Sequence, residues 1–217
     1  YKRQGPTSFE GPFLLSSIAR GLLRLGGWTL VGEHPGVPKA VIIAAPHTSN
    51  WDGIWALIAK VALRLDVHFF GKDSLFWFPL GTILRALGGI PLDRANPGAS
   101  VDQAIRGFRT SDSYYFGMSP EGTRRPKSYW KTGFYRIALG AGVPIVLAFF
   151  DYEKRRIGIG ATLELTGDPE QDLANIRSFY TDHGHPKHAG MMSTIAFDAS
   201  RARGANTRAE ASIEPPN

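Results

Sequence analysis

Short, uninterrupted apolar runs alternate with longer helical stretches through most of this sequence. The clearest run, 40–45, reads Ala-Val-Ile-Ile-Ala-Ala and is typical of a strand buried on both faces of a sheet. Such an alternation predicts an α/β fold, with a mixed, mostly parallel sheet and helices on both faces. The expected strands are 40–45, 66–70, 89–92, 113–118, 143–150 and an edge strand at 156–165. The expected helices are 8–25, 51–65, 74–87, 99–109, 132–140 and one that begins at Asp168.

A chain of 217 residues fits one domain better than two. We therefore expect an N-terminal segment, 1–35, that contains an amphipathic helix, one folded domain, 36–197, and a tail, 198–217. The tail is small and polar and has almost no large apolar residues, so we expect it to be disordered.

The chain contains no cysteine, which excludes disulfides, thiolate metal sites and a cysteine nucleophile. Its formal net charge is +6 and its pI is about 9.7, a balance that favours partners carrying phosphate, such as nucleic acid, anionic lipid or a phosphorylated substrate. Nucleic acid is not expected, because the sequence has no zinc-finger spacing and no long basic run with interleaved aromatic residues. A basic surface that only keeps the protein soluble is the other interpretation of the charge.

Segment 8–25 has the pattern of an amphipathic helix in which Arg20 and Arg24 lie one turn apart beside an apolar face. This pattern suits the headgroup boundary of a membrane, and the alternative is a helix packed on the protein's own core. No stretch has the roughly 18 apolar residues that a spanning helix requires, and no signal peptide is recognisable. We therefore expect a peripheral protein on the cytoplasmic face of the cell membrane.

A histidine and an aspartate flank the junction between the expected strand 40–45 and the helix that follows it. His47 and Asp52 are five residues apart, which on a continuous helix would separate them by about 140°. They can meet only if His47 lies in the loop and Asp52 in the first helical turn, and residues 48–50 are all good N-caps. The carboxylate would orient the ring, while the helix N-terminus disfavours its protonated form. We interpret the pair as a histidine aimed for general-base work; a capping aspartate beside an unrelated histidine is the alternative.

The segment 119–125, Ser-Pro-Glu-Gly-Thr-Arg-Arg, also follows an expected strand. Gly122 permits a tight turn with exposed N–H groups, Thr123 adds a hydroxyl, and two arginines follow. Guanidinium groups in this setting can hold a phosphate through paired hydrogen bonds, and Glu121 would have an arginine partner. An ordinary charged turn is the alternative.

Together the two segments resemble the glycerolipid acyltransferase family, which includes the lysophosphatidate acyltransferases. His47 and Asp52 match its H-x4-D block. The later blocks match Lys72-Asp73-Ser74-Leu75 with Pro79, Gly81 and Gly89-Ile90-Pro91-Leu92-Asp93-Arg94, then Pro120 to Arg124, then Val143-Pro144-Ile145. The resemblance covers Ala44 to Ala148 and implies that 36–197 is an acyltransferase domain.

The resemblance implies an O-acyltransferase of phospholipid biosynthesis or remodelling. His47, assisted by Asp52, would remove a proton from the hydroxyl of a lysophospholipid such as lysophosphatidate. The oxygen would then attack the thioester of acyl-CoA or acyl-carrier protein without a covalent enzyme intermediate. The expected partners are this acceptor, this donor and a membrane surface, with no cofactor besides the donor and no metal. The residues expected to bind the substrate are Lys72, Arg94, Glu121, Gly122, Thr123 and Arg124.

Two departures from the family pattern affect the acceptor more than the chemistry. Ser119 stands where many members have an apolar or aromatic residue, and the two-helix membrane motif of some members is reduced to one amphipathic helix. Other lysolipids, including amino-acid-containing lipids, therefore stay open as acceptors. A non-catalytic phospholipid-binding module is a further alternative. A serine hydrolase is disfavoured, because no Gly-x-Ser-x-Gly elbow is present.

Three histidines lie within 182–188, close to the spacing of metal ligands. The segment is rich in glycine and proline, and no other ligand cluster matches it. We interpret it as a surface loop.

Overall fold

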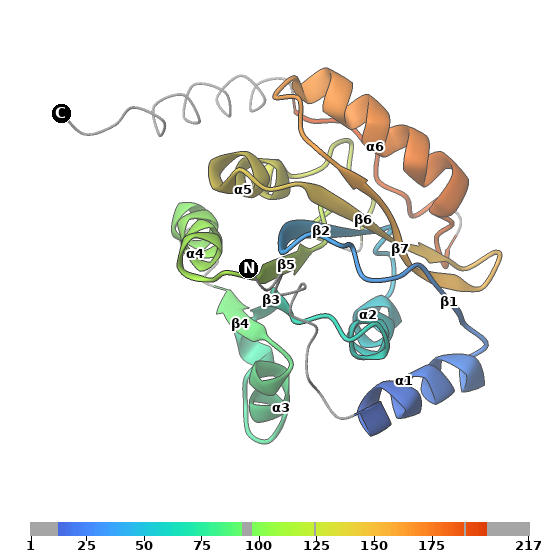
Figure 1. Ribbon diagram of the computed structural model, residues 1–217. Helices are drawn as coiled ribbons and strands as arrows, with labels where there is room; N and C mark the ends of the chain where they lie inside the picture. Colours follow the sequence, from blue (N-terminus) through green and yellow to red (C-terminus); the bar gives the residue numbers. More distant parts are fainter. Residues whose placement is uncertain (1–12, 93–96, 124, 189, 199–217) are drawn as a thin grey trace, which may run out of the picture.

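The computed structural model describes residues 13–92, 97–123, 125–188 and 190–198. They form one sheet of seven strands with helices on both faces (Figure 1). The strands are β1 (Thr29–Val31), β2 (Lys39–Ala45), β3 (Val67–Lys72), β4 (Gly89–Leu92), β5 (Tyr114–Met118), β6 (Ile145–Asp151) and β7 (Arg156–Leu163). The helices are α1 (Phe13–Leu25), α2 (Asn50–Ala62), the 3₁₀ turn η1 (Asp73–Leu75), α3 (Leu80–Ala86), α4 (Pro97–Thr110), α5 (Gly133–Ala141) and α6 (Pro169–His183).

The strand order is β1-β7-β6-β2-β5-β3-β4, and every neighbouring pair is parallel except β6 and β7. In the central strand β2, Ile43 pairs with Met118 of β5 on one side and with Leu147 of β6 on the other. Parallel strands end at the same edge of a sheet, so the segments that follow β2, β5 and β6 leave this edge side by side. We call it the carboxyl edge, and in open α/β sheets it is where ligands bind.

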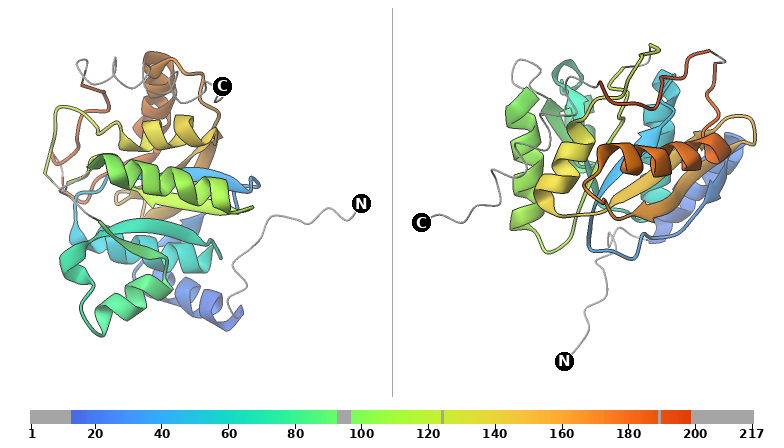
Figure 2. Two further views of the ribbon diagram at one scale, coloured as in Figure 1. Left: turned by 90° about the vertical axis from the view of Figure 1, so that its left-hand side faces the viewer. Right: turned by 90° about the horizontal axis from the view of Figure 1, so that it is seen from above.

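The apolar core lies on both faces of the sheet, because successive residues of a strand point to opposite sides. Val41 and Ile43 of β2 pack in one cluster with α4, α5 and α6. Ala40 and Ile42 belong to a cluster on the other face, where α2 covers the sheet and α1 packs on α2. The turned view on the left of Figure 2 shows the separation, with α5 and α6 above and α1 and α3 below.

The expected α/β arrangement with helices on both faces is confirmed, but the expected edge strand is not at an edge. β7 lies between β6 and β1. The sequence does not predict β1, which has only three residues and pairs Thr29 with the distant Arg156. The expected helix 74–87 is also divided: η1 ends at Leu75 and α3 begins after Pro79, because proline has no N–H to donate inside a continuing helix.

Parts of the expected terminal segments lie outside the described residues. These are residues 1–12, which include the start of the expected N-terminal helix, and residues 199–217 of the expected tail. Within the described part of the chain the N-terminal helix runs over Phe13–Leu25. No described helix has the length and apolar character needed to cross a membrane.

Helix α2 carries Asp52 in its first turn and has a well-formed N-terminus. The Ser49 side chain accepts a hydrogen bond from the N–H of Trp51, and the Asp52 carboxylate accepts one from the N–H of Ser49. This reciprocal pairing is a capping box, which satisfies N–H groups that the first helical turn leaves free. The start of α2 is therefore fixed by the same carboxylate that faces His47.

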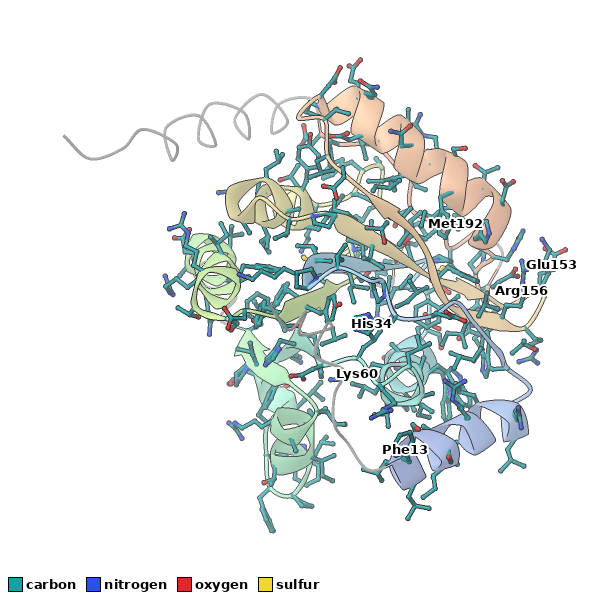
Figure 3. The ribbon with its side chains drawn as sticks, in the orientation of Figure 1. Phe13, His34, Lys60, Glu153, Arg156 and Met192 are labelled. Atoms are coloured by element: carbon teal, nitrogen blue, oxygen red, sulfur yellow. The ribbon has the colours of Figure 1, made fainter. Side chains whose placement is uncertain are left out.

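The other end of α2 is tied to the sheet by one lysine. Lys60 Nζ donates to the main-chain oxygens of Val67 at 2.8 Å and Leu87 at 2.7 Å, and it lies between α2 and β3 (Figure 3). Burial lowers the pKa of this amine to about 8, although the Asp66 carboxylate opposes the shift. The helix is thus held where β3 begins and α3 ends.

The free energy of unfolding of wild type, compared with that of a Lys60→Met variant, should increase as the pH is raised. Lysine in an unfolded chain has a pKa of about 10.4, whereas burial lowers the pKa of Lys60 to about 8. Between these values the unfolded state binds more protons, so raising the pH favours the folded state. We expect wild type to gain about 2 kcal/mol on the variant between about pH 8 and pH 10 in urea titrations. Parallel pH profiles would contradict this assignment.

Candidate active site

The junction between β2 and α2 places His47 beside Asp52. His47 Nδ1 lies 3.3 Å from Asp52 Oδ2, with His47 in the loop and Asp52 in the first turn of α2. This contact is the one that the sequence predicts, and Ser49 is the residue that caps the helix. The His47 side chain is 26% exposed, while that of Asp52 is fully buried. The ring can therefore be reached from outside, and its carboxylate partner is shielded from water.

Both oxygens of the Asp52 carboxylate accept hydrogen bonds. Oδ2 accepts the N–H groups of Thr48 and Ser49, each at 2.7 Å, and Oδ1 accepts the hydroxyl of Tyr152. Burial by itself would raise the pKa of Asp52, but hydrogen bonds from His47, Tyr152 and Ser49 outweigh it, and the net effect is a lowered pKa. Asp52 is therefore an anion at neutral pH although water does not reach it.

The position of Asp52 determines which ring nitrogen of His47 is available for chemistry. Nδ1 faces the carboxylate, so this nitrogen carries the ring proton and donates it to Asp52. Nε2 is left with a free lone pair on the exposed side of the ring. An imidazole in this tautomer can accept a proton from a bound hydroxyl.

The main chain of His47 is held from the opposite side by Glu121. Glu121 Oε2 accepts the N–H of His47 at 2.6 Å, and the Glu121 side chain is buried. Burial raises the pKa of Glu121, although the N–H groups of His47 and Ser193 and the charge of His47 act against the shift. The sequence predicts an arginine partner for Glu121. Among the described residues its partners are the N–H groups of His47 and Ser193, and Arg124 lies outside these residues. Glu121 thus joins the two motif segments.

The segment after β5 forms a tight turn at the carboxyl edge. The N–H of Gly122 donates to the oxygen of Ser119 at 3.3 Å, and Gly122 has a φ of 62°, a conformation that glycine adopts without a steric penalty. The N–H of Arg125 donates to Thr123 Oγ1 at 3.3 Å. The turn thus places Thr123 and Arg125 beside the residues that begin α2, and together they line one pocket.

An open pocket of about 450 Å³ lies between the two loops, lined by Thr48, Ser49, Asn50, Thr123, Arg125 and Met191. The hydroxyl of Thr48, one of these lining residues, is buried and has no hydrogen-bond partner among the described residues. The exposed Arg125 and the positive end of the α2 dipole both favour negative charge. The pocket is therefore suited to an anionic group.

The other expected site residues are only partly placed. Lys72 is exposed at the end of β3, and β5 separates that strand from β2. The structure thus brings Glu121, Gly122 and Thr123 to the same edge of the sheet as His47, with Lys72 two strands away. Arg94 and Arg124 lie outside the described residues.

Tyr152 is a site residue that the sequence interpretation missed. It follows β6, which pairs with β2 on the side opposite β5, and its hydroxyl reaches Asp52. The available signal was its position just after the apolar run 143–150. That signal could not be used, because the sequence does not reveal which strands are neighbours of 40–45.

The histidine-rich segment contacts the end of a strand. His185 Nδ1 lies 3.0 Å from a carboxylate oxygen of the buried Asp151, whose other oxygen is 3.0 Å from Arg156 (labelled in Figure 3). In the part of the chain that the structure describes, no cluster of three or more histidine, aspartate and glutamate side chains could hold a metal ion. The segment attaches the region after α6 to the end of β6.

The sequence model of one protein family, described as Acyltransferase, matches residues 31–148, more than half of the chain. The chain belongs to this family. The matched part runs from the end of β1 into β6 and contains His47, Asp52 and the turn after β5. The expected relationship to acyltransferases is therefore confirmed.

Two relatives within the acyltransferase family are named 1-acyl-sn-glycerol-3-phosphate acyltransferase. The one from Streptococcus pneumoniae is 30% identical in a 149-residue alignment that covers 64% of this chain and 55% of the relative. The one from Haemophilus influenzae is 32% identical in a 153-residue alignment that covers 64% of this chain and 61% of the relative. The chain thus spans less than two thirds of the length of these relatives.

A solved acyltransferase structure has the same fold. The crystal structure of the 1-acyl-sn-glycerophosphate (LPA) acyltransferase PlsC from Thermotoga maritima aligns with a TM-score of 0.51. The alignment covers 94% of this chain and 80% of that chain at 16% identity. At this identity the likeness concerns the fold alone.

Replacing Asp52 by asparagine should destabilise the protein at neutral pH and much less in acid. The pKa of Asp52 is lowered in the fold, so its stabilising effect is present above the unfolded pKa of about 3.9 and is lost as the pH falls through the folded pKa. We expect Asp52→Asn to lose about 2 kcal/mol at neutral pH, as for a buried hydrogen-bonded charge, and the loss to shrink in acid. Urea titrations at several pH values measure this difference. A loss that is the same in acid as at neutral pH would contradict the assigned contacts.

Proposed function

We propose that the protein is an O-acyltransferase that moves a fatty acyl group from an acyl thioester to the hydroxyl of a lysophospholipid such as lysophosphatidate. The observation that carries this proposal is the His47–Asp52 pair, in which a partly exposed imidazole has its Nδ1 3.3 Å from a buried carboxylate. A module that only binds lipid has no need of a base oriented in this way. The relatives named 1-acyl-sn-glycerol-3-phosphate acyltransferase support the same reaction class and a place in phospholipid biosynthesis or remodelling.

The proposed reaction uses the free Nε2 of His47 as the base. Nε2 takes the proton of the acceptor hydroxyl while the hydroxyl oxygen attacks the carbonyl carbon of the thioester. Asp52 stabilises the imidazolium that forms. The C–S bond then breaks, the new C–O ester bond remains, and the departing thiolate takes the proton from His47. No covalent enzyme intermediate forms, and acyl-CoA or acyl-carrier protein is needed only as co-substrate, with no further cofactor.

We assign the phosphate of the acceptor to the pocket between the two loops. The pocket of about 450 Å³ is lined by Arg125, Thr123 and Thr48, and Arg125 is exposed. Thr48, which lines the pocket, directly follows His47 in the chain. A phosphate held there would bring a neighbouring glycerol hydroxyl close to the base. The family resemblance adds Lys72, Arg94 and Arg124 to this basic environment.

The acceptor is a membrane lipid, and exposed apolar side chains are concentrated at one end of the molecule. Helix α1 buries Ser16, Ala19 and Leu23. The large apolar side chains that α1 exposes are Phe13, Leu14, Leu15, Ile18, Leu22 and Leu25. Around η1 and α3 the exposed ones are Leu75, Trp77, Phe78 and Ile83. Helices α1 and α3 both lie at the lower end in Figure 1 and in the left view of Figure 2.

This end of the molecule is the surface that we propose rests on the membrane. Exposed apolar patches of this extent mark contact surfaces, and tryptophan is enriched at membrane interfaces. Arg20 and Arg24 of α1 are exposed beside the patch and would attract anionic headgroups. The protein would then be peripheral, on the cytoplasmic face of the cell membrane.

Acyl transfer should depend on His47. Purified protein in vesicles with a panel of lysolipids and labelled acyl-CoA or acyl-carrier protein should form a labelled diacyl product. His47→Ala should lower the rate by about 1,000-fold, as expected for loss of a general base. His188→Ala, which removes an exposed histidine from the segment after α6, is the matched control and should keep the activity. Failure of wild type to acylate any lysolipid from either donor would overturn the proposal.

Binding to vesicles should weaken when the exposed aromatic residues before α3 are removed. Trp77 is 59% and Phe78 is 84% exposed, so replacing both by serine should disturb the core little while removing apolar area that the bilayer would bury. We expect partitioning onto phosphatidylglycerol vesicles to fall at least about tenfold in sedimentation assays. Met192→Ser is the control, because Met192 is 39% exposed and lies toward the opposite, α6 end (Figure 3). Equal loss in both variants, or no loss, would contradict the proposed orientation.

A further inference from the structure

We propose that Tyr152 is a positioning residue of the active site, whose hydroxyl fixes Asp52 and, through Asp52, sets the orientation and the basicity of His47. The inference rests on the proposed function and adds to it a third group that neither the motif blocks nor the family model contains. The family model ends at residue 148, before Tyr152. The role follows from the contacts of one carboxylate.

The two oxygens of Asp52 have different partners, and Tyr152 provides the partner of the second one. Oδ2 is occupied by the N–H groups of Thr48 and Ser49 and by the ring of His47. Oδ1 accepts the Tyr152 hydroxyl. Because the Asp52 side chain is fully buried, water cannot take the place of that hydroxyl. Without it the carboxylate would have a buried oxygen unpaired, and more of its negative charge would lie on the oxygen that faces His47.

Tyr152 is itself held in one place. It is the first residue after β6, and its N–H donates to the oxygen of His185 at 3.0 Å. Its ring meets the buried Trp28 edge-on, with the ring centroids 4.8 Å apart. Burial and then the Asp52 carboxylate raise the pKa of Tyr152 above its usual value, with Arg155 acting in the opposite direction. The phenol therefore stays protonated and remains a donor across the pH range in which a histidine acts as a base.

The hydrogen bond from Tyr152 draws negative charge toward Oδ1 and away from the oxygen that faces His47. A carboxylate that has lost this bond attracts a proton on the imidazole more strongly. Within the described ranges, the other charged groups that act on this cluster are Glu121, which faces His47 and Asp52, and Arg155, which acts on Tyr152. Both remain when only the Tyr152 hydroxyl is removed. In Tyr152→Phe we therefore expect His47 to stay protonated up to a higher pH. The pH range in which its neutral ring can act as a base would then be narrower.

The test is the Tyr152→Phe variant of the full chain, assayed for acyl transfer as a function of pH. We expect kcat to fall roughly 10- to 100-fold, the factor that a hydrogen bond to a charged group is worth, with KM for the lysolipid nearly unchanged. We also expect the acid limb of the kcat/KM profile to move up by about 0.5 to 1 pH unit. A residue that only supports the fold would not shift this limb.

The matched control is Tyr135→Phe. Tyr135 donates its hydroxyl to a buried carboxylate in the same way, to Asp172 Oδ2 at 2.7 Å, but between α5 and α6 on the other face of the sheet. Removing that hydroxyl should lower the stability while leaving kcat and the pH profile as in wild type. If both variants show the same pH profile as wild type, the positioning role of Tyr152 is overturned.

A second measurement separates this inference from the proposed reaction. The ring signals of His47 can be followed by NMR in the free protein, and their titration midpoint should lie at higher pH in Tyr152→Phe than in wild type or Tyr135→Phe. If wild type transfers no acyl group but the midpoint moves, the proposed function fails while the link from Tyr152 to His47 stands. A midpoint that is unchanged or lower in Tyr152→Phe overturns the link whatever the reaction is.

Discussion

The carboxylate of Asp52 is removed from water, and hydrogen bonds from separate segments of the chain keep it ionised. Burying an anion without partners costs several kcal/mol, so the loop after β2, the first turn of α2 and the residue after β6 must all be in place before this group is tolerated. The same carboxylate takes part in the capping box of α2 and orients His47. The contacts that stabilise this junction are therefore also the contacts that align the base.

The sheet supplies what this carboxylate needs from distant parts of the sequence. β2 lies between β5 and β6, parallel to both, so the chain after each strand emerges at the carboxyl edge. The β5 side contributes Glu121, which holds the main chain of His47. The β6 side contributes Tyr152, which holds Asp52. The base is thus supported from both neighbouring strands, while its own strand provides only the loop that carries it.

The features that the sequence predicts well depend on neighbours in the chain. Strand 40–45 is recognisable because it is apolar throughout, and the capped helix after it because serine and aspartate stand at the right spacing. The same local logic predicts the contact between His47 and Asp52, which requires only a loop followed by a helical turn. Nothing local signals β1, because its partner strand lies far along the chain, and β7 is therefore mistaken for an edge strand.

The sequence by itself determined most of the order of elements, the acyltransferase family and the residues at the β2–α2 junction. Apolar periodicity, helix capping and motif spacing are properties of short segments. Only the tertiary structure decided what Glu121 and Tyr152 contact. Their partners depend on the strand order β6-β2-β5, and strand order is set by packing across the whole sheet. A carboxylate in a charged turn and a tyrosine after a strand look the same in sequence whether they face solvent or a buried active site.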